Sequence, residues 1–184
     1  MWRALNQFSR SRASWLLLLL CVIGLEATAL YFQHNQGLAP CVMCIYERVA
    51  LFGVGTAALL GLIAPENPFW RTVGLLAYGI TAAWGLKLSL EHVSYQFPDP
   101  SQLFGATCDV AVNFPSWAPL NQWLPQVFEA YGDCSEVVWQ WLDWSMPQWL
   151  VGIFSAMLFV WLLVVIAQFI GRPPRRIFFL ITHG

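Results

Sequence analysis

The sequence has 184 residues, of which 58% are hydrophobic and only 10% are charged. A soluble domain typically has about 45–50% apolar and about 25% charged residues, so the composition excludes both an ordinary soluble domain and a disordered chain. The net charge of −1 excludes a global positive field that would hold nucleic acid. The composition instead predicts that the whole chain, residues 1–184, forms a single integral membrane domain.

Four apolar segments are each long enough to cross a bilayer as a helix, which takes roughly 20 residues. These segments cover about residues 15–32, 45–64, 72–90 and 149–170. Backbone polar groups in lipid must be hydrogen-bonded within their own segment, and helices meet this requirement. The fold class that we expect is therefore an all-α membrane protein, a bundle of four transmembrane helices.

Basic and acidic residues are sorted between the connecting segments, and this sorting predicts the direction of the spans. The loop 33–44 has no charge, and the loop 91–146 has seven acidic residues and no Lys or Arg. The positive-inside rule places the basic segments 1–14, 65–71 and 171–184 in the cytoplasm and both other loops outside. The basic residues of these inner segments are Arg3, Arg10, Arg12, Arg71, Arg172, Arg175 and Arg176.

The first span also has features of a cleavable signal peptide. Arginines precede a leucine-rich stretch, and Ala27-Thr28-Ala29 is similar to a cleavage site. However, Glu26 interrupts the apolar stretch beside that site, and cleavage would leave three spans with the new N-terminus outside. We therefore expect a retained span, with signal cleavage as the alternative.

Four of the five cysteines fall in the two outer loops. Cys41 and Cys44 lie in the first outer loop, and Cys108 and Cys134 lie in the second. Disulfides persist on the non-cytoplasmic side of a membrane, so the four residues predict two disulfides, although four cysteines allow three connectivities. The fifth cysteine, Cys21, lies within the first span and is expected to be an inert, small apolar residue.

The two cysteine pairs differ in what a disulfide would contribute. A bond between Cys108 and Cys134 would close a long loop. It would stabilise the folded protein by roughly 3 kcal/mol, because it lowers the entropy of the unfolded chain. A bond between Cys41 and Cys44 would close almost no loop, and C-x-x-C is the spacing of redox-active pairs. The alternative is a zinc site that His34 and His92 would complete, although a second pair of ligands at zinc-binding spacing is missing.

The predicted position of Cys44 favours redox chemistry. Cys44 lies where the second span begins, and the N-terminus of a helix carries roughly half a positive charge that stabilises a thiolate. Arg48 follows four residues later on the same helix face and would add a full positive charge. Glu47 either neutralises Arg48 or faces elsewhere, and the two charges could also reach the headgroups as a pair.

Two further charges lie within the spans. Glu26 is deep in the first span, where a carboxyl group should be protonated or paired; a structural hydrogen bond and a proton relay are both open roles. Lys87 is close to the outer end of its span, and its side chain is expected to extend to the interface.

The second outer loop contains a segment that is typical of a helix lying on the membrane. Between Ser116 and Phe128, apolar residues recur at helical spacing, and tryptophan, which concentrates at the bilayer interface, is frequent in this loop. Pro119 and Pro125 interrupt the segment, so we expect a short, imperfect amphipathic helix. A compact loop core built from the same residues is the alternative.

Several local motifs occur at matching places in this four-span topology. They are Pro40-Cys41-Val42-Met43-Cys44-Ile45-Tyr46-Glu47-Arg48, Glu91-His92, Ala106-Thr107-Cys108-Asp109, Gly132-Asp133-Cys134 and Met146-Pro147-Gln148-Trp149. With these motifs, nearly the whole chain resembles the bacterial inner-membrane disulfide bond formation protein B (DsbB) family. The stretch between Glu91 and Cys108 is somewhat longer than in that family's best-known members.

The resemblance implies a protein-dithiol:quinone oxidoreductase that reoxidises a periplasmic thioredoxin-fold donor, DsbA. It implies the disulfides Cys108–Cys134 and Cys41–Cys44. On the family's pattern, a donor thiolate attacks Cys108, and the released Cys134 exchanges with the second disulfide through Cys41. A DsbA–DsbB–quinone chain of this kind keeps the bacterial periplasm oxidising.

The resemblance also implies the surroundings of the electron acceptor, which is ubiquinone or menaquinone from the membrane pool that feeds the respiratory chain. Cys44 would be left as a thiolate beside the quinone. Arg48 would stabilise the Cys44 thiolate and the reduced quinone, and His92 would lie near the quinone ring. No metal is implied, and the protein would lie in the inner membrane with both termini in the cytoplasm.

Two other functions are compatible with four spans and outer-loop cysteines. A tetraspanin-like, non-enzymatic membrane organiser would use its loop disulfides structurally, but the large loop lacks Cys-Cys-Gly and the small loop carries C-x-x-C. The closer alternative is a specialised paralogue of the thiol oxidase that serves a different donor.

Overall fold

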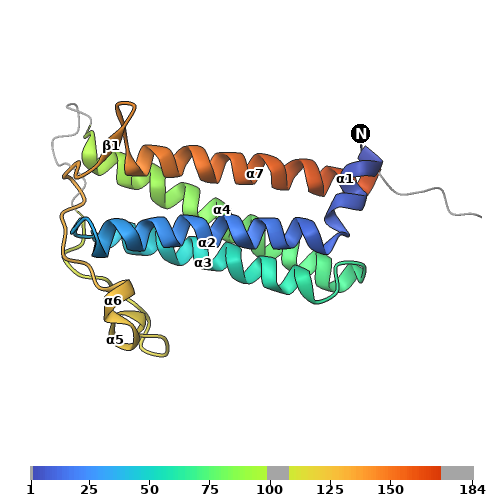
Figure 1. The fold of residues 1–184 in the computed structure, drawn as a ribbon, viewed down its shortest axis with the longest axis horizontal. Helices are drawn as coiled ribbons and strands as arrows, with labels where there is room; N and C mark the ends of the chain where they lie inside the picture. The colour runs from blue at the N-terminus through green and yellow to red at the C-terminus, as the bar shows by residue number, and fades with distance from the viewer. Residues whose placement is uncertain (1, 99–107, 171–184) are drawn as a thin grey trace, which may run out of the picture.

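The computed structural model describes residues 2–98 and 108–170. Within this part of the chain, four helices are long and apolar enough to cross a membrane. They run alternately up and down, so both cysteine-bearing loops lie at one end of the bundle (Figure 1). The structure confirms the predicted all-α fold with four spans. The helices are α2 (Arg12–His34), α3 (Val42–Ile63), α4 (Pro68–Gln96) and α7 (Met146–Ile170).

Some of the predicted features fall on residues outside the described part. Three of the basic residues that were assigned to the cytoplasmic tail, Arg172, Arg175 and Arg176, lie there, as do Ala106 and Thr107 of one motif. The other half of that motif, Cys108 and Asp109, is described.

Side chains in the connecting segments fix where the spans begin. The Ser11 hydroxyl accepts a hydrogen bond from the Ala13 N–H at 3.2 Å and caps α2. Asn67 Oδ1 accepts one from the Phe69 N–H at 2.9 Å and caps α4, with Pro68 in the first turn. Such caps satisfy N–H groups that have no partner within the helix.

The helix α4 extends past the predicted end of its span at Leu90 and continues to Gln96. Hydropathy measures only the apolar length of a segment, whereas helical hydrogen bonding continues into the polar region beyond it. As a result Glu91 and His92, which the sequence placed in the outer loop, lie on the last turns of α4. This extension brings His92 to the cysteines.

The core of the bundle is centred on α3, which packs against both α2 and α4, while α4 also packs against α7. Glycines accept aromatic rings at these contacts, because a Cβ atom at each position would overlap the ring. Gly61 lies against Trp15, and Gly79 lies against Trp161. Gly85 of α4 lies against Phe154 of α7, which is fully buried.

We expect Gly85→Ala to lower the stability of the bundle. The added Cβ would overlap the Phe154 ring, and overpacking of this kind costs about 1–3 kcal/mol. Gly152→Ala, on the facing helix, is the matched control, because a Cβ there meets nothing within 4 Å. Thermal unfolding in detergent should show a lower midpoint for the first variant and an equal or higher one for the second. Equal shifts in both variants would contradict the packing described here.

A short helix precedes the first span and was not predicted. This helix, α1 (Trp2–Ser9), lies across the end of α7 (Figure 1). Asn6 Nδ2 donates a hydrogen bond to the Ala167 carbonyl oxygen at 3.0 Å, and Gln168 Nε2 donates one to Ser9 Oγ at 2.8 Å. The polar side chains of α1 thus attach the start of the chain to the end of the last span.

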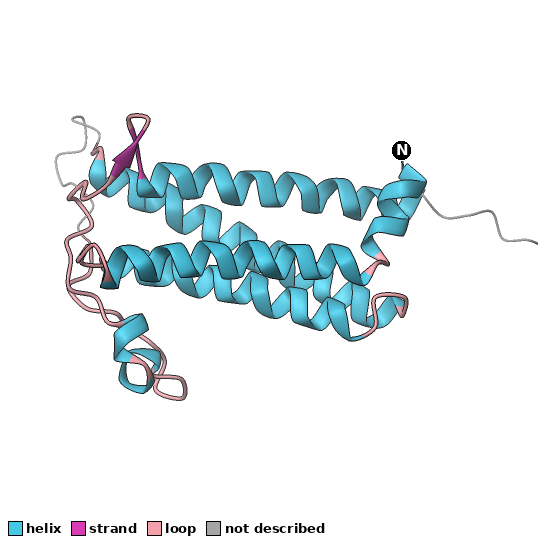
Figure 2. Ribbon diagram, in the orientation of Figure 1, coloured by secondary structure: helices cyan, strands magenta, loops and turns pink. Residues whose placement is uncertain are grey.

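The amphipathic segment of the second outer loop forms two short helices instead of one. They are α5 (Leu120–Trp123) and α6 (Pro125–Phe128), which lie beside the cysteine-loop end of the bundle (Figures 1 and 2). Pro125 divides them because a proline disfavours helical geometry at the preceding residue; Leu124 has φ −136° and ψ 69°. Pro125 itself is well suited to the first turn of α6.

A small antiparallel hairpin precedes α7 and was also not predicted. Its strands are β1 (Gln140–Trp141) and β2 (Trp144–Ser145), joined through Leu142 and Asp143, which both have positive φ. Two-residue turns of this kind usually carry Asn-Gly or Asp-Gly, so this sequence lacks the usual signal. The Trp149 ring stacks near Trp141, with ring centres 5.0 Å apart, and holds the hairpin against α7.

Candidate functional site at the cysteine loops

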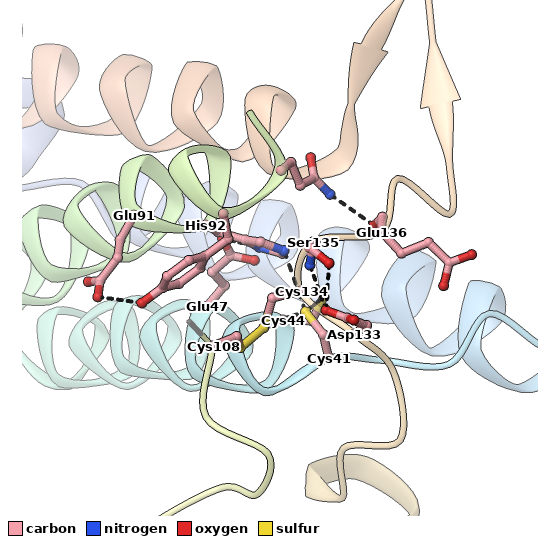
Figure 3. Close-up of a disulfide and its surroundings, with 12 residues drawn as sticks. Cys41, Cys44, Glu47, Glu91, His92, Cys108, Asp133, Cys134, Ser135 and Glu136 are labelled. Carbon is pink, nitrogen blue, oxygen red and sulfur yellow. Dashed lines mark hydrogen bonds and ion pairs between the residues drawn. A yellow bond between two sulfur atoms is a disulfide. The ribbon is translucent and has the colours of Figure 1, made fainter. Parts of the chain in front are cut away.

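The backbone of the long loop is attached to the short loop just before Cys41. The Pro40 carbonyl oxygen accepts hydrogen bonds from the N–H groups of Tyr131 at 2.9 Å and Gly132 at 3.0 Å. Gly132 also pairs with Cys41 in a parallel β-bridge. A Cβ on Gly132 would lie 2.5 Å from the Ala39 carbonyl oxygen, so this approach requires glycine. The attachment holds Cys134, two residues later, beside Cys41 (Figure 3).

Cys108 and Cys134 are joined by a disulfide, with their Cα atoms 6.0 Å apart (Figure 3). Cys134 is buried, with 1% of its surface exposed, and packs in the same apolar cluster as Cys41. Asp133 is exposed, and hydrogen bonds from the Ser135 N–H and hydroxyl hold the pKa of its carboxyl group below the usual range. One cysteine of the disulfide, Cys134, is therefore inside the protein, and the anionic Asp133 precedes it at the surface.

Cys41 and Cys44 are free thiols in this structure, with their Sγ atoms 2.8 Å apart. The disulfide between these two residues that the resemblance implies stays a prediction. Three-residue spacing at the start of a helix places both side chains on one side.

The N-terminus of α3 acts on both of these cysteines. Cys41 is the N-cap of α3, and its Sγ accepts a hydrogen bond from the Cys44 N–H at 3.2 Å. Cys44 lies in the first turn, as predicted. Because the backbone donor points at Cys41, the helix N-terminus stabilises negative charge on Cys41 as well as on Cys44.

His92 and Glu47 form a buried pair behind Cys41. His92 Nε2 lies 3.5 Å from Cys41 Sγ, and His92 Nδ1 lies 3.1 Å from Glu47 Oε1. Each residue has 2% of its surface exposed. Glu47 thus faces His92 and not Arg48, because consecutive residues of a helix point about 100° apart.

Arg48 connects three parts of the chain. Its Nε lies 3.5 Å from Glu26 Oε2 on α2, so the deep carboxyl group is paired with a charge. Its Nη1 donates to Gln33 Oε1 at 2.9 Å, and also to the carbonyl oxygen of Val127 in α6. Gln33 Nε2 in turn donates to the Gln126 carbonyl oxygen at 3.0 Å. Arg48 therefore holds the loop helix α6 against the bundle.

A cavity of about 180 Å³ lies between α2, α3 and α7, beside the dithiol pair. Cys44 and Arg48 both line it, together with Glu26, Gln33 and Glu47. Apolar side chains form most of the remaining wall, including Leu25, Ala29, Phe32, Leu51, Trp139, Met146, Trp149, Leu150 and Ile153. His92 does not line this cavity; it lines a separate cavity of about 20 Å³ with Cys41 and Cys44.

The structure therefore brings all four outer-loop cysteines and both predicted accessory residues to one end of the bundle, but it separates Arg48 from His92. Sequence reasoning missed Gln33 and the Val127 carbonyl as partners of Arg48. One signal was available: Glu26 and Gln33 are seven residues apart, which places them on one face of α2. The contact with Val127 depends on the path of the long loop, which local patterns do not specify.

Comparison with known proteins agrees with this arrangement. Residues 11–164 match the family described as "Disulfide bond formation protein DsbB". The chain is 60% identical over 173 residues to a disulfide bond formation protein B of Vibrio parahaemolyticus, covering 94% of each chain. A protein of the same name from Photorhabdus laumondii is 55% identical over 175 residues, covering 94% of this chain and 99% of the relative.

The chain belongs to the DsbB family. It is thus a disulfide formation protein, and its four apolar helices make it a multi-pass membrane protein. DsbB membership together with two adjacent cysteine pairs indicates a thiol oxidoreductase. A third relative of the same name, from Vibrio cholerae, is 59% identical over 165 residues. Membership of this family rules out the tetraspanin-like alternative.

Proposed function

We propose that this protein is a membrane thiol:quinone oxidoreductase that reoxidises a DsbA-like periplasmic donor and so sustains disulfide formation in secreted proteins. One observation carries the proposal: Cys44 and Arg48 line one largely apolar cavity, while Cys41, three residues from Cys44, lies beside the Cys108–Cys134 disulfide. Electrons could therefore pass from the Cys108–Cys134 pair in the loop to the Cys41/Cys44 pair, and from there into the cavity within the bundle.

The proposed relay begins at Cys108. A donor thiolate attacks Cys108, and Cys134 leaves as a thiolate next to Cys41. Cys134 then attacks Cys41 of the oxidised Cys41–Cys44 pair, so that Cys44 leaves as a thiolate. The donor's second thiolate then attacks the mixed disulfide and releases Cys108 as a thiolate. Cys108 attacks Cys134 in the Cys134–Cys41 bond, so that the Cys108–Cys134 disulfide re-forms and Cys41 leaves as a thiolate. The net result is that the donor dithiol is oxidised and the Cys41/Cys44 dithiol is formed.

The residues of the larger cavity fit a quinone. A quinone bound there would accept two electrons and two protons from the dithiol and regenerate the Cys41–Cys44 bond. Among the described residues, Arg48 Nε and both Glu26 carboxylate oxygens lack a hydrogen-bond partner. Arg48 could donate to a quinone carbonyl oxygen, and the apolar walls suit a ring and its tail. Ubiquinone and menaquinone both offer the two carbonyl oxygens required.

The proposal includes the place of the protein in the cell. We infer an inner-membrane protein with both termini in the cytoplasm, because all Lys and Arg residues outside the spans lie in segments 1–14, 65–71 and 171–184. The cysteine loops then face the periplasm, where the donor is found. The alternation of the spans supports this proposal, because it brings both loops to the same end of the bundle (Figure 1).

A donor with a single cysteine tests where the relay begins. Such a donor cannot complete its own disulfide, so we expect a covalent adduct to accumulate when the reduced donor meets the oxidised protein. Peptide mapping should locate the link to the donor at Cys108. Cys134 should be found either in a disulfide with Cys41 or as a free thiol. The Cys108→Ser chain serves as the control and should give no adduct. A link at Cys134 or Cys44 in the unsubstituted protein would contradict the proposed order.

A further inference from the structure

Three groups that commonly bind metal ions converge at the dithiol pair. The Sγ atoms of Cys41 and Cys44 and a ring nitrogen of His92 all lie within 4.8 Å of one another (Figure 3). Glu47 Oε1 is 3.1 Å from Nδ1, the other ring nitrogen of His92. Histidines that bind zinc usually donate their second ring N–H to a carboxylate, which orients the ring. Glu47 and His92 already have this arrangement.

A small cavity adjoins these three groups and provides room for a fourth ligand. Its volume is about 20 Å³, which is enough for one water-sized group. Besides the three groups, Asp133, Glu136 and Gln96 line it. Gln96 Oε1 is buried without a hydrogen-bond partner among the described residues. Asp133 and Glu136 belong to the exposed acidic loop, so the cavity lies where cations are attracted.

We propose that the dithiol state of this protein binds a zinc ion through Cys41 Sγ, Cys44 Sγ and His92 Nε2, with a water molecule or the Asp133 carboxylate as the fourth ligand. Zinc takes sulfur, nitrogen and oxygen ligands in tetrahedral sites, and this cluster offers all three. Two thiolates balance the charge of Zn²⁺, which makes a buried site acceptable. Binding displaces the two thiol protons into solution.

The same chemistry makes the site dependent on the redox state of the pair. Tetrahedral zinc with Zn–S distances of about 2.3 Å holds two sulfurs about 3.8 Å apart, so the pair would open by about 1 Å. A Cys41–Cys44 disulfide removes both thiolates and abolishes the site. Zinc would thus hold the pair reduced and stop turnover. This consequence rests on the proposed function, whereas the binding does not.

Zinc binding can be measured on the full-length chain in detergent without quinone or donor. The chain should carry Cys108→Ala and Cys134→Ala, so that reduction exposes no other pair of outer thiols. Competition between the protein and a chromophoric zinc indicator should give one zinc per reduced chain, and at least 100-fold weaker binding after oxidation of Cys41 and Cys44. Co²⁺ should give a thiolate-to-metal absorption band in the reduced chain alone.

Variants locate the ligands. We expect Cys44→Ser and His92→Ala to weaken zinc binding most, and Glu47→Gln to weaken it about 10- to 100-fold by freeing the His92 ring. His34→Ala is the matched control, because His34 is exposed and lies outside the cluster. Equal zinc affinity in the reduced and oxidised chains, no zinc binding at all, or unchanged affinity in His92→Ala would overturn the proposal. Quinone reduction without zinc tests the proposed function separately.

Discussion

Cys44→Ser is expected to abolish electron transfer to the quinone while leaving the reaction of the donor with Cys108 intact. Cys44 is the cysteine that lines the larger cavity, whereas Cys108 and Cys134 lie in the outer loop. Because a serine hydroxyl cannot carry the electrons, the rate of quinone reduction should fall by roughly 1,000-fold or more. The measurement is the decrease in quinone absorbance after addition of a reduced thioredoxin-fold donor.

Cys21→Ser is the matched control for this experiment. Cys21 is a free cysteine of α2 whose side chain is exposed on the outside of the bundle. Its substitution should leave quinone reduction unchanged, and the single-cysteine donor should still form its adduct with the Cys44→Ser chain. Full quinone reduction by Cys44→Ser would refute the assignment of Cys44 as the last cysteine of the relay.

Arg48→Ala is expected to weaken the use of quinone without preventing insertion of the spans. A hydrogen bond to a charged group contributes about 1.5–3 kcal/mol, so the apparent KM for quinone should rise about 10- to 100-fold. Stability should also fall, because removing one partner of a buried ion pair leaves Glu26 uncompensated, at a cost of about 3–5 kcal/mol. Initial rates measured over a range of quinone concentrations give the change in KM.

A second buried arginine separates these two effects. Arg71 lies at the opposite end of the bundle, where its Nε donates to Gln168 Oε1 at 3.1 Å and its Nη1 donates to the Pro65 carbonyl oxygen at 3.0 Å. We expect Arg71→Ala to lower the thermal midpoint while leaving the apparent KM for quinone unchanged. An unchanged KM in Arg48→Ala, or an equal rise in Arg71→Ala, would contradict the role assigned to Arg48.

The spans could be predicted because the requirement that creates them is local. A backbone in lipid must bond within its own segment, so an apolar stretch of sufficient length specifies a helix without reference to the rest of the chain. Arg48 could be predicted as a neighbour of Cys44 for a similar reason, since four residues make about one helical turn. Both predictions needed only the spacing of residues along one helix.

Contacts between different segments could not be predicted from the spacing of residues along one helix. The pairing of Glu26 with Arg48 depends on how α2 and α3 pack, and the Val127 carbonyl reaches Arg48 only because the long loop folds back. His92 lies against Cys41 because α4 continues beyond its apolar stretch, and hydropathy does not indicate this contact. The helix α1 was missed because its hydrogen bonds are made to the distant end of α7.

The stoichiometry of electron transfer tests the central claim most directly. The purified full-length protein, present in a catalytic amount, is mixed with quinone and reduced donor, and quinone absorbance is followed together with the free thiols of the donor. The relay predicts one quinone reduced for each donor dithiol oxidised, with Cys41–Cys44 recovered as a disulfide at the end. Donor oxidation without quinone reduction, or quinone reduction that continues in Cys44→Ser, would contradict it.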